Sequence, residues 1–204
     1  MTHPAVRVIK LGGSLLDWPE SIARLRAWLG AQRPAANVLV AGGGAIVECI
    51  RELDRVHRFS PEAAHWLAIR GMSLTASIVA ELLSEATLVR SVDALQLSSA
   101  GGLEIFDVEQ MLRDEQGRAG ALPCGWEVTG DSIAAHLAGR LKAGELVLLK
   151  SALPADTATH EAAARCGYVD AHFARSARAL AVRFVNLRDG KFAEVALHPA
   201  NAER

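Results

Sequence analysis

The chain has 204 residues, of which 50% are hydrophobic and 22% are charged, and its formal net charge at pH 7 is -1. Against a prior of roughly 150 residues per domain, this length favours one domain over two. The composition excludes a disordered polar chain, and the near-zero charge excludes a strongly basic nucleic-acid binder. Any anionic ligand therefore has to be held by local charge.

The sequence predicts a cytoplasmic protein with no membrane or nucleic-acid partner. Its apolar stretches, such as residues 146–149, are far shorter than the ~20 residues of a spanning helix, and residues 1–4 open no signal peptide. The three cysteines, Cys49, Cys124 and Cys166, are far apart and odd in number. They therefore predict neither a disulfide framework nor a paired zinc site, which fits a reducing compartment.

The first part of the chain predicts two strand-turn-helix units in succession. Each unit has an apolar strand, a glycine turn and a segment with apolar residues at helical spacing. These segments are residues 6–11, 12–13 and 19–29 in the first unit and 37–41, 42–44 and 46–53 in the second. Two such units indicate an α/β fold with a parallel sheet.

The rest of the chain continues this alternation and ends in a hairpin. Ser60 and Pro61 form an N-cap and first-turn pair that predicts a helix as far as Ser84, although Gly71 can divide it. Asp189-Gly190 is the strongest short hairpin signal in the sequence. The other predicted elements are strands at 87–90, 146–149, 180–187 and 192–197, an apolar segment at 103–106, and helices at 107–112 and 131–144.

Both glycine clusters lie where ligands of parallel sheets collect, between the end of a strand and the start of a helix. Their amides and the following helix dipoles suit two neighbouring anions, a phosphoryl donor and its acceptor. Lys10 ends the first strand, so its ammonium can lie over a transferring phosphoryl group. One cluster alone is better explained as a tight turn, but the pair together favours the phosphate interpretation.

Several other nucleotide and metal sites are not predicted. The sequence has no P-loop motif, and its first glycine turn lacks the three-glycine dinucleotide spacing. The second strand ends in glycines where a nicotinamide enzyme would place a ribose-binding acid. The seven histidines show no metal-ligand spacing, so we expect Mg2+ only together with a nucleotide.

Four segments in this order resemble the amino acid kinase superfamily, which includes acetylglutamate, aspartate, uridylate and isopentenyl phosphate kinases. They are residues 10–16 (KLGGSLL), 41–44 (AGGG), 129–135 (TGDSIAA) and 146–149 (LVLL). Residues 64–69 (AHWLAI) and 122–129 (LPCGWEVT) further resemble a short subgroup from C1-cofactor pathways. In that subgroup a kinase phosphorylates an aminomethylfuran methyl phosphate during methanofuran synthesis.

The resemblance implies a three-layer α/β/α sandwich and a homo-oligomer. It implies one domain over residues 1–204, with an acceptor-binding part over about 1–125 and a shortened nucleotide-binding part over about 126–204. It also implies direct transfer of the γ-phosphoryl group of Mg-ATP to a small molecule, without a covalent enzyme intermediate. Catalysis would then consist of positioning and charge neutralisation.

The resemblance also implies roles for individual residues. Lys10 would hold the transferring group, and Asp131 would orient lysines. Lys150 would replace a later family lysine that residues 152–183 lack. The nucleotide would contact Gly12, Gly13, Ser14 and Lys150, and the acceptor would contact Gly42, Gly43 and Gly44. Side-chain chemistry adds further acceptor contacts: ring stacking by Trp66 and Trp126, and hydrogen bonds from His65, Thr129 and Ser132.

Six of these side chains also have a plainer structural explanation. Asp131, Thr129 and Ser132 are ordinary capping residues, and Lys150 is an ordinary solvent-facing lysine at a strand end. His65 and Trp66 are compatible with the core and surface of a helix.

The sequence therefore leaves three functions open. The first is a phosphotransferase acting on a small molecule such as a phosphomonoester. The second is a carboxylate kinase that makes an acyl phosphate. The third is an inactive nucleotide-binding protein that retains the fold. The identity of the acceptor and the oligomeric state are also left open.

Overall fold

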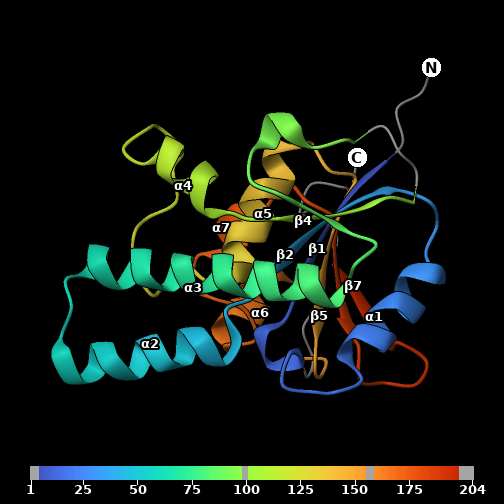
Figure 1. Cartoon of the computed structure of the whole chain (residues 1–204), viewed down its shortest axis with the longest axis horizontal. Coiled ribbons are helices and arrows are strands. Elements are labelled where there is room, and N and C mark those ends of the chain that lie inside the picture. Colours follow the sequence, from blue (N-terminus) through green and yellow to red (C-terminus); the bar gives the residue numbers. More distant parts are fainter. Residues whose placement is uncertain (1–4, 98–100, 155–158, 198–204) are drawn as a thin grey trace.

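The computed structural model describes residues 5–97, 101–154 and 159–197 and contains one central sheet (Figure 1). Within these residues the sheet has seven strands in the order β3-β4-β2-β1-β5-β6-β7. All neighbours are parallel except β6 and β7, which are antiparallel. The predicted parallel sheet and final hairpin are thus confirmed. The strands are β1 (Val6–Leu11), β2 (Ala36–Ala41), β3 (Thr87–Val89), β4 (Leu103–Phe106), β5 (Glu145–Lys150), β6 (Val182–Asn186) and β7 (Glu194–Leu197).

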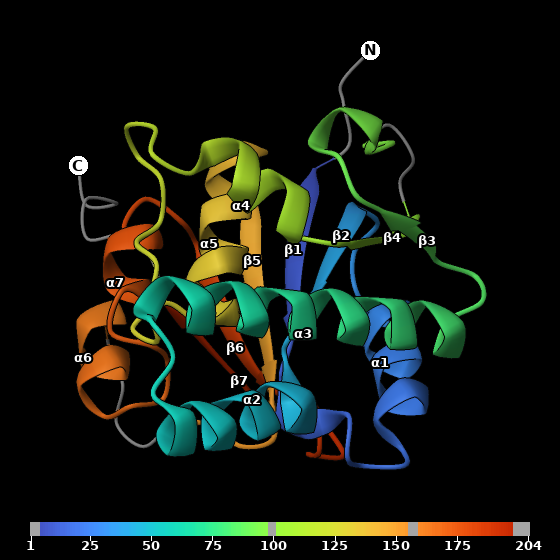
Figure 2. The ribbon, with the colours of Figure 1, turned by 60° about the vertical axis from the view of Figure 1, so that its left-hand side comes forward.

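The helices cover both faces of this sheet (Figure 2). They are α1 (Ser21–Gly30), α2 (Gly44–His57), α3 (Pro61–Leu82), α4 (Glu109–Glu115), α5 (Gly130–Arg140), α6 (His160–Arg165) and α7 (Phe173–Ser176), with short 3-10 helices η1 (Gly13–Leu15) and η2 (Val92–Ala94). The helices α6 and α7 have no signal in the sequence, because six and four residues are too few for an apolar period to be visible.

The helix α3 forms as predicted at its start but is not divided at Gly71. The Ser60 hydroxyl accepts a hydrogen bond from the amide of Ala63 at 3.2 Å, and Pro61 occupies the first turn. A Cβ atom at Gly71 would lie 3.0 Å from Val47 and 3.1 Å from Ile50. This glycine therefore lets α2 and α3 pack closely side by side, and it does not break the helix.

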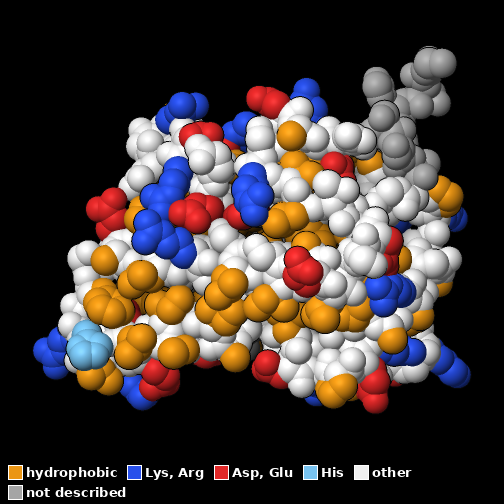
Figure 3. All heavy atoms as spheres, in the orientation of Figure 1, with side chains coloured by type: hydrophobic (Ala, Val, Ile, Leu, Met, Phe, Trp, Pro, Cys, Tyr) orange, Lys and Arg blue, Asp and Glu red, His pale blue; other side chains and the backbone are white. Residues whose placement is uncertain are grey.

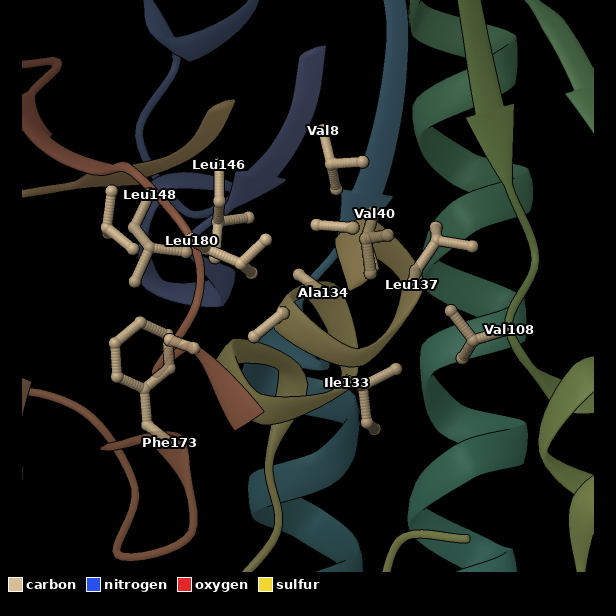
Figure 4. Close-up of a cluster of buried hydrophobic side chains, with 14 of the residues drawn as sticks. Val8, Val40, Val108, Ile133, Ala134, Leu137, Leu146, Leu148, Phe173 and Leu180 are labelled. Atoms are coloured by element: carbon tan, nitrogen blue, oxygen red, sulfur yellow. The ribbon is translucent and has the colours of Figure 1, made fainter. Parts of the chain in front are cut away.

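The core has two halves because alternate strand residues point to opposite faces of the sheet. On one face, side chains such as Val8, Val40 and Leu148 pack against α5 and α7 (Figure 4). On the other face, Ile9 and Leu39 pack against α1 and the C-terminal half of α3. The expected three-layer α/β/α sandwich is thus confirmed.

The sheet places three strand ends at one rim. Leu11 at the end of β1 pairs with Ala41 at the end of β2 and with Leu149 near the end of β5. Because these three strands are parallel neighbours, the turns that follow them start side by side. Lys10 and Lys150 therefore lie on adjacent strands near the same rim.

No helix within the described residues has the length and apolar content needed to cross a membrane. Residues 1–4, considered above for a signal peptide, lie outside the described residues. The cytoplasmic location stays a prediction from the sequence.

Candidate functional site

The glycine turns that follow β1 and β2 touch each other. A Cβ atom at Gly13 would lie 2.3 Å from the backbone nitrogen of Gly44, and one at Gly42 would lie 2.7 Å from the backbone nitrogen of Gly13. Gly44 also has a φ of 53°, in the left-handed region that side chains disfavour. The two turns therefore approach this closely only because their residues are glycines.

Only some of the glycine amides are available to a ligand. The amide of Gly12 donates to the carbonyl of Leu149 at 2.9 Å, and the amide of Gly42 donates to the carbonyl of Leu11 at 2.9 Å. These two bonds extend the hydrogen-bonding pattern of the strands, which corrects the expectation that all five glycines present amides to an anion. The amides of Gly13, Gly43 and Gly44 donate to no described residue.

Two lysines share one buried carboxylate behind the turns. The Lys10 Nζ atom lies 2.9 Å from Oδ1 of Asp131, and Lys150 donates a hydrogen bond to Oδ2 of Asp131 at 2.7 Å. Asp131 lies in the first turn of α5, where the helix dipole favours a negative charge. The site thus contains two ammonium groups bridged by one acid.

The ionisation of this cluster follows from its burial and its charges. Burial disfavours the charge on Asp131, but Lys10 and Lys150 outweigh it and hold the pKa of this carboxyl below its ordinary value. For Lys150, burial and the nearby Lys10 lower the pKa, and the attraction of Asp131 opposes them only in part. The carboxylate is therefore charged at neutral pH, and Lys150 releases its proton more readily than a free lysine.

Tyr168 completes the surroundings of Lys150. The backbone carbonyl of Tyr168 accepts a hydrogen bond from Lys150 at 2.9 Å, and the Lys150 ammonium lies 5.0 Å from the centre of its ring. The Tyr168 hydroxyl donates to the carbonyl of Ala152 at 2.8 Å, and burial raises its pKa. Together with Asp131 these contacts hold the Lys150 side chain, which is 16% exposed, so it is not a solvent-facing strand-end lysine.

The start of α5 is capped by Asp170. This carboxylate accepts hydrogen bonds from the amide and hydroxyl of Thr129 at 3.1 and 2.8 Å, and from the amide of Ser132 at 3.1 Å. It also accepts one from the Ser132 hydroxyl. Both hydroxyls that were expected to bind the acceptor are thus engaged within the protein, because they satisfy a helix N-terminus.

A cavity of about 540 Å³ opens next to this cluster. It is bounded by the two glycine turns, by α2 and α3, and by the segment that precedes α5. Nine of the predicted site residues line it: Lys10, Gly13, Ser14, Gly42, Gly43, Gly44, His65, Trp126 and Thr129. The other predicted site residues, which are Gly12, Trp66, Asp131, Ser132 and Lys150, do not line this cavity.

The segment that bears Trp126 is held against α2 and α3. Nδ1 of His65 accepts a hydrogen bond from the amide of Gly125 at 3.3 Å, and burial lowers the pKa of this histidine, which favours the neutral ring. The Trp126 indole donates to Asp54 at 2.7 Å, and the Arg51 guanidinium lies 4.3 Å from the centre of a Trp126 ring. These contacts form one wall of the cavity.

Trp66 has a different position from the one expected. It meets the ring of His65 edge-on at 5.1 Å, packs against the core and lies under the guanidinium of Arg113 at 4.2 Å. Its place on α3 directs it away from the cavity, since adjacent helix residues point in different directions. Trp66 therefore does not line the cavity, contrary to the expectation from the sequence.

Four residues of this site are not predicted from the sequence: Arg51, Asp54, Tyr168 and Asp170. Arg51 lies in the helix predicted over 46–53, and Asp54 follows it directly, so their three-residue spacing could have indicated a shared face if the helix had been extended. Tyr168 and Asp170 lie in a loop with no periodic pattern, so nothing in the sequence pointed to them.

The described residues contain no cluster of three or more histidine, cysteine, aspartate or glutamate side chains that could hold a metal ion. A divalent cation at this site would therefore need phosphate oxygens among its ligands.

Comparison with known sequences adds two findings. Residues 5–152 match the sequence model of the amino acid kinase family. Among curated proteins, [5-(aminomethyl)furan-3-yl]methyl phosphate kinase of Methanocaldococcus jannaschii is 22% identical over 154 residues, which cover 70% of this chain. The match spans 64% of the length of that relative.

Comparison with solved structures shows the same fold in several kinases. The UMP kinase of Ureaplasma parvum has a TM-score of 0.64 at 13% identity, covering 96% of this chain and 99% of its own. The UMP kinase of Bacillus anthracis has a TM-score of 0.62 at 14% identity, with coverage of 97% and 100%. Aspartate kinase from Synechocystis has a TM-score of 0.60 at 14% identity, covering 98% of this chain and 41% of its own.

Proposed function

Because the chain belongs to the amino acid kinase family, we propose that it transfers the γ-phosphoryl group of ATP to a small-molecule acceptor. The observation that carries this proposal is the convergence of Lys10 with the unpaired amides of Gly13, Gly43 and Gly44 on one cavity. An ammonium group and preorganised amides are what a transferring phosphoryl group requires for charge neutralisation. The cavity next to them has room for a small organic acceptor.

In the proposed reaction an oxygen of the acceptor attacks the γ-phosphorus, and ADP leaves. Lys10 neutralises charge on the transferring group, and the three amides hold its oxygens or those of the acceptor. Asp131 acts as a positioning residue because it holds Lys10 and Lys150 at 2.9 and 2.7 Å. Mg2+ would enter with the nucleotide and neutralise its phosphate oxygens.

The acceptor we propose is a phosphomonoester such as an aminomethylfuran methyl phosphate, which would be converted into a diphosphate in the synthesis of a C1 cofactor. Support comes from the 22% identity with the kinase of Methanocaldococcus jannaschii that is named for this acceptor. A carboxylate acceptor would give an acyl phosphate in the same cavity. An inactive protein is an alternative because residues 152–183 lack the later family lysine. Lys150, which is bonded to Asp131 together with Lys10, offers a second cation in its place, and this supports an active enzyme.

The proposal is tested by a screen of ATP consumption with phosphomonoesters, carboxylic acids, and aminomethylfuran alcohols or their phosphates. We expect a diphosphate product, visible by phosphorus NMR, from a phosphomonoester and no product that hydroxylamine traps. Trapping would identify the carboxylate kinase instead. ATP binding without turnover on any acceptor class would contradict the proposed activity.

The role of Lys150 is tested by comparing the turnover of two lysine variants. We expect Lys150→Ala to abolish most turnover, and the exposed Lys191→Ala to serve as a matched control with normal turnover. Intact turnover in Lys150→Ala would refute the idea that Lys150 replaces the later family lysine.

The proposed division into an acceptor part over about 1–125 and a nucleotide part over about 126–204 stays a prediction.

We also propose a homo-oligomer formed through α2 and α3. Leu74, Ile78 and Leu82 recur every four residues on the outer side of α3 and are 53%, 41% and 49% exposed. Leu53 and Val56 of α2 extend this apolar surface, which is visible as a band of hydrophobic side chains in Figure 3. A linear stripe of this kind is self-complementary about a two-fold axis, so a second copy of the chain is its proposed partner.

A further inference from the structure

We propose that Arg51 binds the anionic group of the acceptor and thereby selects phosphomonoesters over the corresponding uncharged alcohols. This inference rests on the proposed function, since it concerns the same cavity. It assigns to one side chain the choice of acceptor class, which neither the family resemblance nor the glycine turns determine.

The charges around the cavity single out Arg51. Lys10 and Arg51 are the two lysine or arginine residues that line it. Lys10 is already paired with Asp131, which it shares with Lys150. Asp17 and Glu48 also line the cavity, and Glu48, which lies 3.4 Å from Arg51, is 66% exposed. Of the two cations, Arg51 is therefore the one whose acidic partner is exposed to solvent, where an ion pair is weak.

The guanidinium of Arg51 has N-H donors that no hydrogen bond within the described residues satisfies. Its Nε atom is buried and makes no hydrogen bond to the described residues, and the carboxylate of Glu48 lies 3.4 Å away. The side chain remains 43% exposed and borders the cavity. A guanidinium offers five donors in a planar fork that matches the oxygens of a phosphate or carboxylate. The Nε atom faces Glu48, whereas the two Nη groups make no hydrogen bond to the described residues and are the donors that a ligand in the cavity can reach.

Trp126 holds this guanidinium in place. The Arg51 guanidinium carbon lies 4.3 Å from the centre of the Trp126 ring, close enough for a cation-π contact. The indole nitrogen donates to Asp54 at 2.7 Å, three residues further along α2. Arg51 and Asp54 therefore present the same helix face to Trp126. The ring contacts the guanidinium carbon, and the N-H groups of the guanidinium are still able to donate to a ligand.

The direction of the side chain brings Arg51 toward the transfer site. Arg51 follows Gly44 by seven residues on α2, which is two helical turns or about 10 Å. Side chains of a helix lean toward its N-terminus, so the guanidinium extends back toward Gly44. Its closeness to Glu48, three residues earlier, is consistent with this direction. An anion at the start of α2 would then lie between the amide of Gly44 and the guanidinium of Arg51.

The test is a binding titration by calorimetry without nucleotide, so that it does not depend on turnover. The probes are [5-(aminomethyl)furan-3-yl]methyl phosphate, phenyl phosphate and the alcohol that corresponds to each. We expect Arg51→Met to raise the Kd of both phosphomonoesters by about 10- to 100-fold, since a hydrogen bond to a charged group is lost. Arg51→Lys, which keeps the charge without the fork, should give a smaller increase.

Arg55→Met is the matched control. Arg55 lies on the same helix, does not line the cavity and pairs with Glu52 at the surface, where it is 75% exposed. Its substitution should leave every Kd unchanged, and thermal unfolding should show that all three variants are folded. Equal Kd values for wild type and Arg51→Met, equal binding of alcohols and phosphomonoesters, or no binding of either phosphomonoester to the wild type would overturn the proposal.

Turnover measured separately distinguishes this inference from the proposed function. If phosphomonoesters bind through Arg51 but receive no phosphoryl group from ATP, the kinase proposal fails and the assignment of Arg51 stands. If they are phosphorylated and Arg51→Met leaves the acceptor KM unchanged, the assignment of Arg51 fails and the kinase proposal stands.

Discussion

Replacing Asp131 by asparagine removes the charge that holds two lysines together while keeping the shape of the side chain. With an effective dielectric constant near 20, each contact at 2.9 or 2.7 Å corresponds to about 6 kcal/mol of attraction before desolvation is subtracted. Loss of one member of a buried ion pair typically costs about 3–5 kcal/mol in net terms. We expect a loss of this size, which lowers the Tm of a chain of this length by about 10 °C.

The dependence of this loss on pH tests its electrostatic origin. Asp131 has a lowered pKa in the folded protein, so its contribution to stability is present above its unfolded pKa and disappears as pH falls through the folded value. Lys150 also has a lowered pKa, and without Asp131 that pKa falls further. Deprotonation of Lys150 then relieves the repulsion from Lys10. The deficit of the variant should therefore shrink as pH rises from near 7 to near 9.

The assay is urea unfolding of wild type and Asp131→Asn at both pH values, with the exposed Asp93→Asn as control. The control should change the free energy of unfolding by less than about 0.5 kcal/mol. A loss below about 1 kcal/mol for Asp131→Asn, or a loss that is equal at the two pH values, would refute the electrostatic account of this cluster.

Three further predictions address the turns, the helix cap and the outer surface. Gly13→Ala should destabilise the protein and abolish ATP-dependent turnover, because its Cβ would lie 2.3 Å from the backbone nitrogen of Gly44. The control is Gly30→Ala, whose Cβ would meet nothing within 4 Å and which should be neutral or slightly stabilising in thermal unfolding. Asp170→Ala should lower the free energy of unfolding by about 1–2 kcal/mol in urea titrations, because it removes the cap of α5; no change would show that the cap is dispensable. Ile78→Glu should shift sedimentation toward the monomer, and an unchanged sedimentation coefficient would contradict an interface on α3.

Much of the fold was predictable because its signals are local. The strands β1, β2 and β5 are largely buried and appear in the sequence as mainly apolar runs, as expected for central parallel strands, although β1 also contains Arg7 and Lys10. The hairpin of β6 and β7 was indicated by its turn residues. The helices α6 and α7 escaped prediction because their few residues are stabilised by contacts with distant parts of the chain.

The residues of the site show the same difference between local signals and tertiary contacts. The glycine turns and Lys10 were predictable because each lies beside the strand that positions it. The hydrogen bonds that occupy Gly12 and Gly42 depend on sheet register, which the sequence does not show. The roles of Asp170 and Arg51 depend on tertiary proximity to Thr129 and Trp126, respectively, and chain position alone carries no information about such contacts.

The cap of α5 by Asp170 has a consequence for when the lysine cluster can be assembled. Four donors at the start of α5 depend on a carboxylate that follows Ser132 in the chain by 38 residues. While the nascent chain is being synthesised, Lys10, Asp131 and Lys150 emerge from the ribosome well before residue 170 does. The lysine cluster therefore gains its full support only once residues 168–170 are present, so we expect a chain that ends before them to hold Asp131 and Lys150 less firmly.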